Sequence, residues 1–404
     1  MNKKIVIAGA GHAAGQVIAT LKQKKFDGYI YLIGEEAYLP YQRPALSKKY
    51  LAGEFLAERL NFKASDFYNE PNFEVHLNTR IDKIEPTTKV IQSSDNLEFS
   101  YDTLVLSLGA RARHMDLPGV ELAGVHYLRT IKDADRIREK FRPDRRLIIV
   151  GAGYIGLEVA AIAVQLGLDV SVVEILDQVM SRVVSAQVSE FYQKEHRDHG
   201  VKLLLSTGIK GFVGDDHVRA VDLADGTQIP ADLVVIGIGV VPNTKLAVDA
   251  GLEVSNGIVV NDHCNTSDPD IYAVGDCTSH PNDVLGYRLR LESVHNALEQ
   301  AKTAAANICG EDQKYSQVPW FWSDQYDLKL QIAGLSQNYD KTIIRGNPDS
   351  RSFSCLYLNE NRLIAVDAIN RPKDFIQSKK LIANHAVINP KLLADSNIEL
   401  KNMV

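Results

Sequence analysis

Two glycine-rich segments of the chain have the spacing of turns that bind a pyrophosphate. They read Gly9-Ala10-Gly11-His12-Ala13-Ala14 and Gly151-Ala152-Gly153-Tyr154-Ile155-Gly156. In such a turn the first glycine permits a tight bend, the second lets phosphate approach the backbone, and the third small residue lets helix and strand pack closely. The N-terminus of the following helix offers free N–H groups to the phosphates. The two segments therefore predict two dinucleotide-binding sites.

An acidic residue follows each turn at the end of the next apolar run. Glu35 ends the first unit, and Glu174 ends the second at an offset of about 20 residues from its first glycine. A carboxylate at this point accepts hydrogen bonds from ribose hydroxyls. Glu174 would repel the 2′-phosphate of NADPH, so the sequence favours NADH. Arg182 is the nearest cation that could weaken this preference.

Apolar runs around the two turns predict the elements that position them. Strand, glycine turn, helix and strand form a βαβ unit, and continuous apolar strands are typical of a parallel sheet covered on both faces. The first copy has strands at 4–8 and 29–33 and a helix at 13–21; the second has strands at 146–150 and 170–174 and a helix at 157–166. Further buried strands are expected at 233–236 and 271–274.

The C-terminal part has a different pattern. Aromatic residues at 320–322 mark a boundary, and runs at 352–358 and 362–367 predict an antiparallel hairpin with a three-residue turn at 359–361. The fold class predicted is α/β, with two Rossmann-like dinucleotide-binding domains plus a C-terminal α+β domain with an antiparallel sheet.

Bulk properties limit the possible partners. The chain has 404 residues and a formal net charge of -6, which argues against nucleic acid or an anionic membrane as a partner. No apolar run approaches the roughly 20 residues that span a bilayer. No signal-peptide pattern is evident at the N-terminus, so a cytoplasmic protein is expected.

The four cysteines, Cys264, Cys277, Cys309 and Cys355, are scattered. No pair has the spacing of a redox-active dithiol or a zinc site, and no metal site is predicted. Because no cysteine precedes Cys264, reduction of disulfides and a cysteine-based peroxidase reaction are both disfavoured.

Several segments resemble the NADH-dependent ferredoxin reductases of bacterial oxygenase systems, over nearly the whole chain. The resemblance rests on segments 43–48, 153–158, 273–277, 292–297 and 319–325. It implies an FAD-binding domain at 1–112 and 244–319, an NADH-binding domain at 113–243 and a C-terminal domain at 320–404. The family usually has two prolines after the arginine at position 43, whereas this chain has Pro44 and then Ala45.

The resemblance also implies residues for each cofactor. Those expected to contact FAD are Gly9, Gly11, His12, Ala13, Ala14, Glu35, Arg43, Lys48, Ile81, Arg129, Asp276, Val294 and Trp322. Those expected to contact NADH are Gly151, Gly153, Tyr154, Ile155, Gly156, Glu158, Glu174, Gly237, Ile238 and Gly239. The imidazole of His12 itself is expected to be structural.

Glu158 lies within an apolar, alanine-rich segment, where a charge is costly to bury without a partner. The resemblance suggests Lys48 as that partner, in a catalytic pair beside the nicotinamide.

The resemblance implies an FAD-dependent NADH:ferredoxin reductase. Hydride would pass from NADH to FAD, and single electrons to a 2Fe-2S ferredoxin that feeds an oxygenase. The alternative is an NADH-responsive FAD-binding sensor resembling apoptosis-inducing factor. Neither the identity of the ferredoxin nor that of the oxygenase follows from the sequence.

Overall fold

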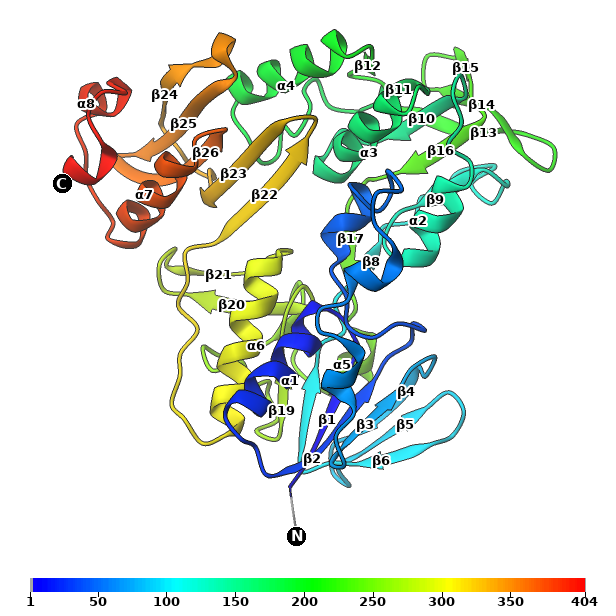
Figure 1. The fold of residues 1–404 in the computed structure, drawn as a ribbon, viewed down its shortest axis with the longest axis vertical. Coiled ribbons are helices and arrows are strands. Elements are labelled where there is room, and N and C mark those ends of the chain that lie inside the picture. The colour runs from blue at the N-terminus through cyan, green and yellow to red at the C-terminus, as the bar shows by residue number, and fades with distance from the viewer. Residues whose placement is uncertain (1–2, 404) are drawn as a thin grey trace. The chain divides into compact units, whose positions relative to one another are not determined.

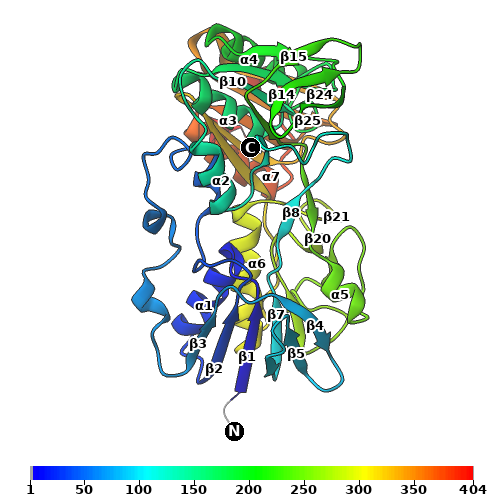
Figure 2. The same cartoon turned by 90° about the vertical axis from the view of Figure 1, so that its right-hand side faces the viewer.

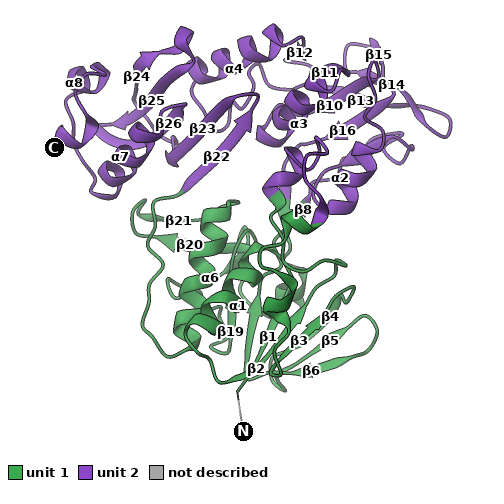
Figure 3. Ribbon diagram, viewed as in Figure 1, with its two compact units in different colours: residues 1–43, 58–111, 241–319 green, residues 44–57, 112–240, 320–404 purple. Residues whose placement is uncertain are grey.

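The computed structural model describes residues 3–403. By their internal contacts these residues divide into two compact units, which are coloured separately in Figure 3. The first unit takes in the chain up to residue 43, then 58–111 and 241–319. The second takes in 44–57, 112–240 and the residues from 320 onward.

A five-stranded parallel sheet forms the centre of the first unit, with the strand order β19-β7-β1-β2-β3. Figure 2 shows four of its strands, β7, β1, β2 and β3. Its strands are β1 (Lys3–Ala8), β2 (Gly28–Ile33), β3 (Phe73–His76), β7 (Thr103–Leu106) and β19 (Ile271–Ala273). Side chains of β1 alternate between the faces. Ile5 and Ile7 pack with the helices α1 (His12–Gln23) and α6 (Val294–Ile308), which lie side by side in Figure 1.

The opposite face of this sheet receives Val6 and Ala8 of β1. They share a core with residues of a three-stranded antiparallel sheet, such as Ile84 and Phe99. Both faces are therefore covered, as the continuous apolar strands predicted. The other elements of this part are β4 (Ile81–Glu85), β5 (Val90–Ser93), β6 (Glu98–Ser100), β18 (Ile258–Val259), β20 (Thr278–Asn282), β21 (Tyr287–Leu289), α5 (Lys245–Asp249), η2 (Ala57–Leu60) and η3 (Ser65–Tyr68).

The second unit repeats the parallel sheet, in the order β12-β11-β10-β16-β9. Its elements are β9 (Val125–Tyr127), β10 (Arg146–Val150), β11 (Asp169–Val173), β12 (Lys202–Leu204), β16 (Leu233–Ile236), α2 (Ile131–Arg138), α3 (Tyr154–Gln165) and α4 (Ala186–Asp198), with an antiparallel sheet of β13 (Ile209–Gly214), β14 (Val218–Leu223) and β15 (Gln228–Pro230). The chain crosses between the units in η1 (Arg43–Ser47), in β8 (Ala110–Ala112) and in β17 (Val240–Pro242). It also crosses between residues 57 and 58 and between residues 319 and 320.

A five-stranded antiparallel sheet, ordered β22-β23-β26-β25-β24, completes the second unit. Its elements are β22 (Trp320–Gln325), β23 (Leu328–Gly334), β24 (Lys341–Asn347), β25 (Ser352–Asn359), β26 (Arg362–Ile369), α7 (Pro372–Ala383), α8 (Pro390–Ala394), η4 (Pro348–Ser350) and η5 (Leu400–Asn402). The predicted fold class is confirmed: two parallel sheets with glycine turns, and an antiparallel C-terminal sheet.

Two details of the prediction were wrong. Both glycine-turn helices begin earlier than expected, at His12 and Tyr154, because Gly11 and Gly153 are themselves the N-cap residues. The C-terminal hairpin has a two-residue turn, since Asn359 pairs with Arg362 across it. Its turn residues have φ angles of 49° and 61°, the left-handed pair that a type I′ turn requires.

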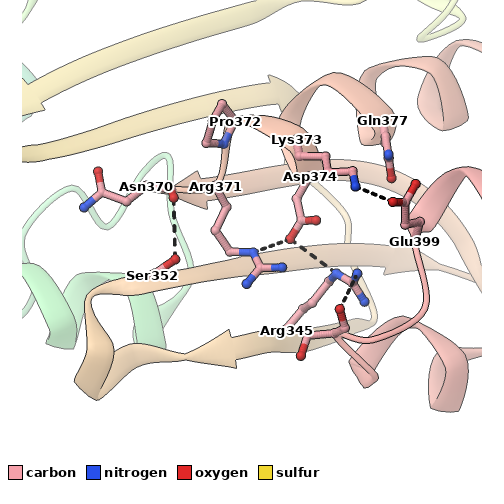
Figure 4. A pocket seen from close by; sticks show the side chains of 10 residues that line it. Arg345, Ser352, Asn370, Arg371, Pro372, Lys373, Asp374, Gln377 and Glu399 are labelled. Atoms are coloured by element: carbon pink, nitrogen blue, oxygen red, sulfur yellow. Dashed lines mark hydrogen bonds and ion pairs between the residues drawn. The ribbon is translucent and has the colours of Figure 1, made fainter.

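Arg345 of β24 anchors the end of the chain. Its side chain is only 2% exposed, and its guanidinium donates to the Asp374 carboxylate (Figure 4). It also donates to the carbonyl oxygens of Leu393, Asp395 and Ile398. It lies in the wall of a pocket of about 260 Å³. The other charges drawn there are also paired, as Arg371–Asp374 and Lys373–Glu399.

We expect Arg345→Met to release the segment from Leu393 onward, because its carbonyl acceptors would lose a buried cationic donor. Breaking a buried charged contact of this kind costs about 3–5 kcal/mol. Limited proteolysis should cut this segment faster, and the Tm should fall. Lys373→Met is the control, because its ion pair with Glu399 is exposed. Equal Tm values and cleavage rates for the two variants would contradict the anchoring role.

Candidate functional site

The first glycine turn joins β1 to α1 in the conformation that a phosphate-binding turn requires. Gly9 has a φ of 103°, and a Cβ there would lie 2.4 Å from the carbonyl oxygen of Ser107. A Cβ at Gly11 would meet nothing within 4 Å among the described residues. Gly11 is the N-cap of α1, and no described side chain caps that helix. No described side chain therefore takes the place of a ligand at the N-terminus of α1, and this fits a pyrophosphate.

The second glycine turn, between β10 and α3, has the same features. A Cβ at Gly156 would lie 2.2 Å from the carbonyl oxygen of Gly151, so only glycine fits against the turn. Gly153 is the N-cap of α3, again with no capping side chain in the described chain. Gly237 borders this turn, with its carbonyl oxygen 2.6 Å from the Cβ position of Gly151. The segment Gly237-Ile238-Gly239 thus lies beside the second turn, as Tyr154 and Ile155 do at the start of α3.

The two acidic residues after the turns differ in their contacts. Glu35 follows β2 and is exposed. Glu174 follows β11, and its carboxylate accepts hydrogen bonds from the backbone N–H groups of Ala152 (2.7 Å) and Leu176 (3.0 Å). A negative charge is therefore held directly against the second glycine turn.

Arg43 of the first unit is held by neighbours that the sequence reading did not identify. Its guanidinium binds the Glu36 carboxylate and donates to the Tyr41 hydroxyl at 2.7 Å. Burial acts to lower the pKa of Arg43, but Tyr41, Glu36 and Asp276 raise it on balance. Arg43 and Asp276 therefore share one electrostatic neighbourhood.

Asp276 lies in the turn between β19 and β20, which packs on the first glycine turn. A Cβ at Gly275 would be 3.5 Å from that of Ala13. The buried Gln300 of α6 holds this turn, because its Oε1 accepts from the N–H of Gly275 (2.7 Å) and the hydroxyl of Thr278 (2.9 Å). Other predicted FAD residues of this unit are Ala14 within α1, Val294 at the start of α6 and Ile81 at the start of β4.

Lys48 and Glu158 form an ion pair inside the second unit, as the resemblance implied. Lys48 Nζ lies 2.7 Å from Glu158 Oε2, and the two side chains are 16% and 4% exposed. Ser47 donates to the same carboxylate oxygen at 2.5 Å, and Ser323 donates to the other at 2.6 Å. Both oxygens of the carboxylate therefore face hydrogen-bond donors.

Of the remaining predicted residues, Trp322 and Arg129 lie in the second unit. Trp322 is partly exposed on β22, and its ring centroid lies 5.6 Å from that of Trp320. Arg129 precedes Thr130, the N-cap residue of α2. In the first unit the ring of His12 packs edge-on against Phe62, at 5.8 Å between centroids, which agrees with a structural imidazole.

Three residues that hold the charged groups of the site were not predicted from the sequence: Ser47, Ser323 and Glu36. A weak signal existed for Ser323, because strand alternation places it on the face opposite Trp322. Ser47 and Glu36 had no comparable signal, since surface loops are rich in such residues.

The described residues also bear on three other kinds of site: reactive thiols, membrane spans and metal centres. Burial raises the pKa of all four thiols, that of Cys277 to about 11. Residues 3–403 contain no helix that is long and apolar enough to cross a membrane. Across the same residues, no group of three or more His, Cys, Asp or Glu side chains could hold a metal ion.

Comparison with known families places these features in context. The model for "Pyridine nucleotide-disulphide oxidoreductase" matches residues 3–301, and that for "Reductase C-terminal" matches residues 320–404. The chain is 41% identical to putidaredoxin reductase of Pseudomonas putida over 409 residues, covering 100% of this chain and 97% of that one. It is also 41% identical to the 5,5'-dehydrodivanillate O-demethylase ferredoxin reductase subunit of a Sphingobium species, covering 98% and 97%.

Solved structures give the same result. The reductase in the covalent putidaredoxin reductase–putidaredoxin complex matches with a TM-score of 0.96 at 41% identity, covering 99% of this chain and 97% of that one. A ferredoxin reductase from Rhodopseudomonas palustris matches with a TM-score of 0.96 at 38% identity, covering 99% of both chains. The chain therefore belongs to the pyridine nucleotide-disulphide oxidoreductase family and, within it, to the ferredoxin reductases.

Proposed function

We propose that this chain is an FAD-dependent NADH:ferredoxin oxidoreductase that passes electrons from NADH to a 2Fe-2S ferredoxin, which in turn feeds an oxygenase. The observation that carries the proposal is a pair of glycine turns on separate parallel sheets, each leading into a helix whose N-terminus no described side chain caps. One turn accounts for FAD and the other for NADH. Family membership and the relatives' names support the same assignment.

Each turn would bind its cofactor through the backbone. The N-terminus of α1 would hold the FAD pyrophosphate, with Glu35 at the ribose and Asp276 at the ribityl chain. The N-terminus of α3 would hold the NADH pyrophosphate, with Glu174 at its ribose. Arg43, Ile81, Arg129, Val294 and Trp322 remain proposed FAD contacts, and Tyr154, Ile155 and Gly237-Ile238-Gly239 remain proposed NADH contacts.

Bound flavin supplies the chemistry that joins a two-electron donor to a one-electron acceptor. The protein's part is to orient the two nucleotides and to place charge beside them. We propose this role for Lys48 and Glu158, next to the nicotinamide. Because burial raises the pKa of all four thiols, a relay of electrons through a cysteine thiolate is disfavoured.

The purified protein should be yellow and hold FAD non-covalently. Under anaerobic conditions NADH should bleach the flavin, and a 2Fe-2S ferredoxin such as putidaredoxin should then be reduced over many turnovers. A colourless protein that cannot be reconstituted with FAD would refute the proposal. A reduced flavin that persists in the presence of ferredoxin would instead favour the NADH-responsive sensor.

As part of this proposal, the chain divides into an FAD domain at 1–112 and 244–319, an NADH domain at 113–243 and a C-terminal domain at 320–404.

We also propose a cytoplasmic location, where NADH is produced and thiols stay reduced. The free state of all four cysteines supports it.

Glu174 should make the enzyme prefer NADH over NADPH, because its carboxylate would repel a 2′-phosphate. Ile175 is 69% exposed, so an arginine there could reach that phosphate. We expect Glu174→Ala combined with Ile175→Arg to lower the NADH:NADPH ratio of kcat/KM by at least about tenfold. Ile175→Ala alone is the control and should leave the ratio unchanged. A wild-type enzyme that uses both cofactors equally would show that Glu174 does not face the ribose.

Lys48→Ala should slow flavin reduction and weaken FAD retention, because it leaves the Glu158 charge buried and without its cation. Removing one partner of a buried ion pair costs about 3–5 kcal/mol. Stopped-flow bleaching by NADH and the flavin content after dialysis give the two readouts. Lys49→Ala is the matched control, because Lys49 is an exposed neighbour. If the two variants have the same rate of flavin reduction, Lys48 has no role in that reaction.

A further inference from the structure

A row of buried polar side chains runs along β22 behind the Lys48–Glu158 pair. Strand alternation puts Ser323 and Gln325 on one face, and the neighbouring Trp322 on the other. Ser323 and Gln325 are 0% and 1% exposed. Polar side chains buried to this degree must be hydrogen-bonded, so their partners define what the row does.

The first links of this row end on Glu158. The Ser323 hydroxyl donates to Glu158 Oε1 at 2.6 Å, on the carboxylate oxygen that Lys48 does not contact. Gln325 Nε2 donates to Ser323 Oγ at 3.2 Å. The amide of Gln325 therefore points its nitrogen toward Glu158 and its oxygen away from it.

The oxygen of the Gln325 amide is hydrogen-bonded to His196 of α4. Its Nε2 lies 2.8 Å from Gln325 Oε1, and its Nδ1 lies 2.9 Å from the Tyr326 hydroxyl. Burial lowers the pKa of His196 to about 4, so the imidazole is neutral at physiological pH. Since a carbonyl oxygen faces Nε2, the proton resides on Nε2, and Nδ1 accepts from Tyr326.

The hydrogen bonds of this row therefore all run in the same direction, from donor to acceptor toward Glu158. Tyr326 donates to His196, His196 to Gln325, Gln325 to Ser323, and Ser323 to Glu158. Hydrogen bonds aligned in this way polarise one another and strengthen the last bond, which ends on a charge. The row therefore restrains one oxygen of Glu158, while Lys48 and Ser47 hold the other.

The outer end of the row is held as well. Tyr326 occupies the tight turn between β22 and β23 with a φ of 58°, and the ring of His199 stacks on it at 3.7 Å between centroids. The next turn residue, Asp327, is bound by Arg351, which also contacts Glu195 of α4 at 3.0 Å. These contacts fix the turn against α4 and hold the Tyr326 hydroxyl within hydrogen-bond distance of His196 Nδ1.

We propose that His196 is a positioning residue for the electron-transfer reaction, which acts through Gln325 and Ser323 to fix the Glu158 carboxylate, and with it Lys48. The proposal rests on the role proposed above for the Lys48–Glu158 pair. We do not propose that His196 itself contacts either cofactor. A buried histidine needs hydrogen-bond partners in any case, and what indicates positioning is that its partner Gln325 leads through Ser323 to Glu158.

Two substitutions separate positioning from packing. His196→Phe keeps the ring but removes both hydrogen bonds, whereas His196→Gln keeps a donor near the position of Nε2. We expect His196→Phe to lower the limiting rate of flavin reduction about tenfold, with little change in the Kd for NADH. His196→Gln should restore the rate to within about twofold. Crystal structures of the FAD-loaded variants should show Glu158 displaced in the first and in place in the second.

The result that would overturn the proposal is a His196→Phe enzyme with Glu158 in place and a normal rate. Equal losses in the Phe and Gln variants would also overturn it, because packing would then explain both. If His196→Phe does not fold, Gln325→Met interrupts the same path from the strand side and should displace Glu158. A displaced Glu158, with normal reduction rates in both His196→Phe and Lys48→Ala, would support the positioning and refute the role of the pair.

Discussion

The second unit depends on the burial of one carboxylate. Glu158 lies on α3 among alanine and aliphatic side chains, and only 3% of it is exposed. A charge in such a place must be surrounded by donors, or it destabilises the fold. The donors come from segments far apart in the chain: Ser47 and Lys48 from the excursion at 44–57, and Ser323 from the C-terminal sheet. Satisfying Glu158 therefore requires three parts of the sequence to meet.

This requirement gives the C-terminal sheet a role beyond covering the core. Its edge strand β22 presents tryptophans on one face and a polar row on the other. The polar row extends to His196 of α4, so the helix, the strand and the charged pair form one hydrogen-bonded structure. A charged site placed on regular strands and helices keeps its geometry better than one built on loops.

The two glycine-turn sites proposed to bind the nucleotides are built differently. Each is built from a strand, a glycine turn and a helix N-terminus, and its binding groups belong to the backbone. Such a site needs few specific side chains, and short-range steric rules already specify it. This is why both glycine turns could be predicted in place, with helix boundaries wrong by a few residues at His12 and Tyr154.

Glycine spacing and apolar strands settled the two sheets, the turns and the fold class, because local sterics and burial govern them. The resemblance supplied Lys48 as the partner of Glu158, which spacing alone did not. The tertiary structure decided the rest: that Glu36 holds Arg43, that Ser47 and Ser323 hold Glu158, and that His196 stands behind them. These contacts join residues distant in the chain, and hydrogen bonds between such residues leave no periodic pattern to read.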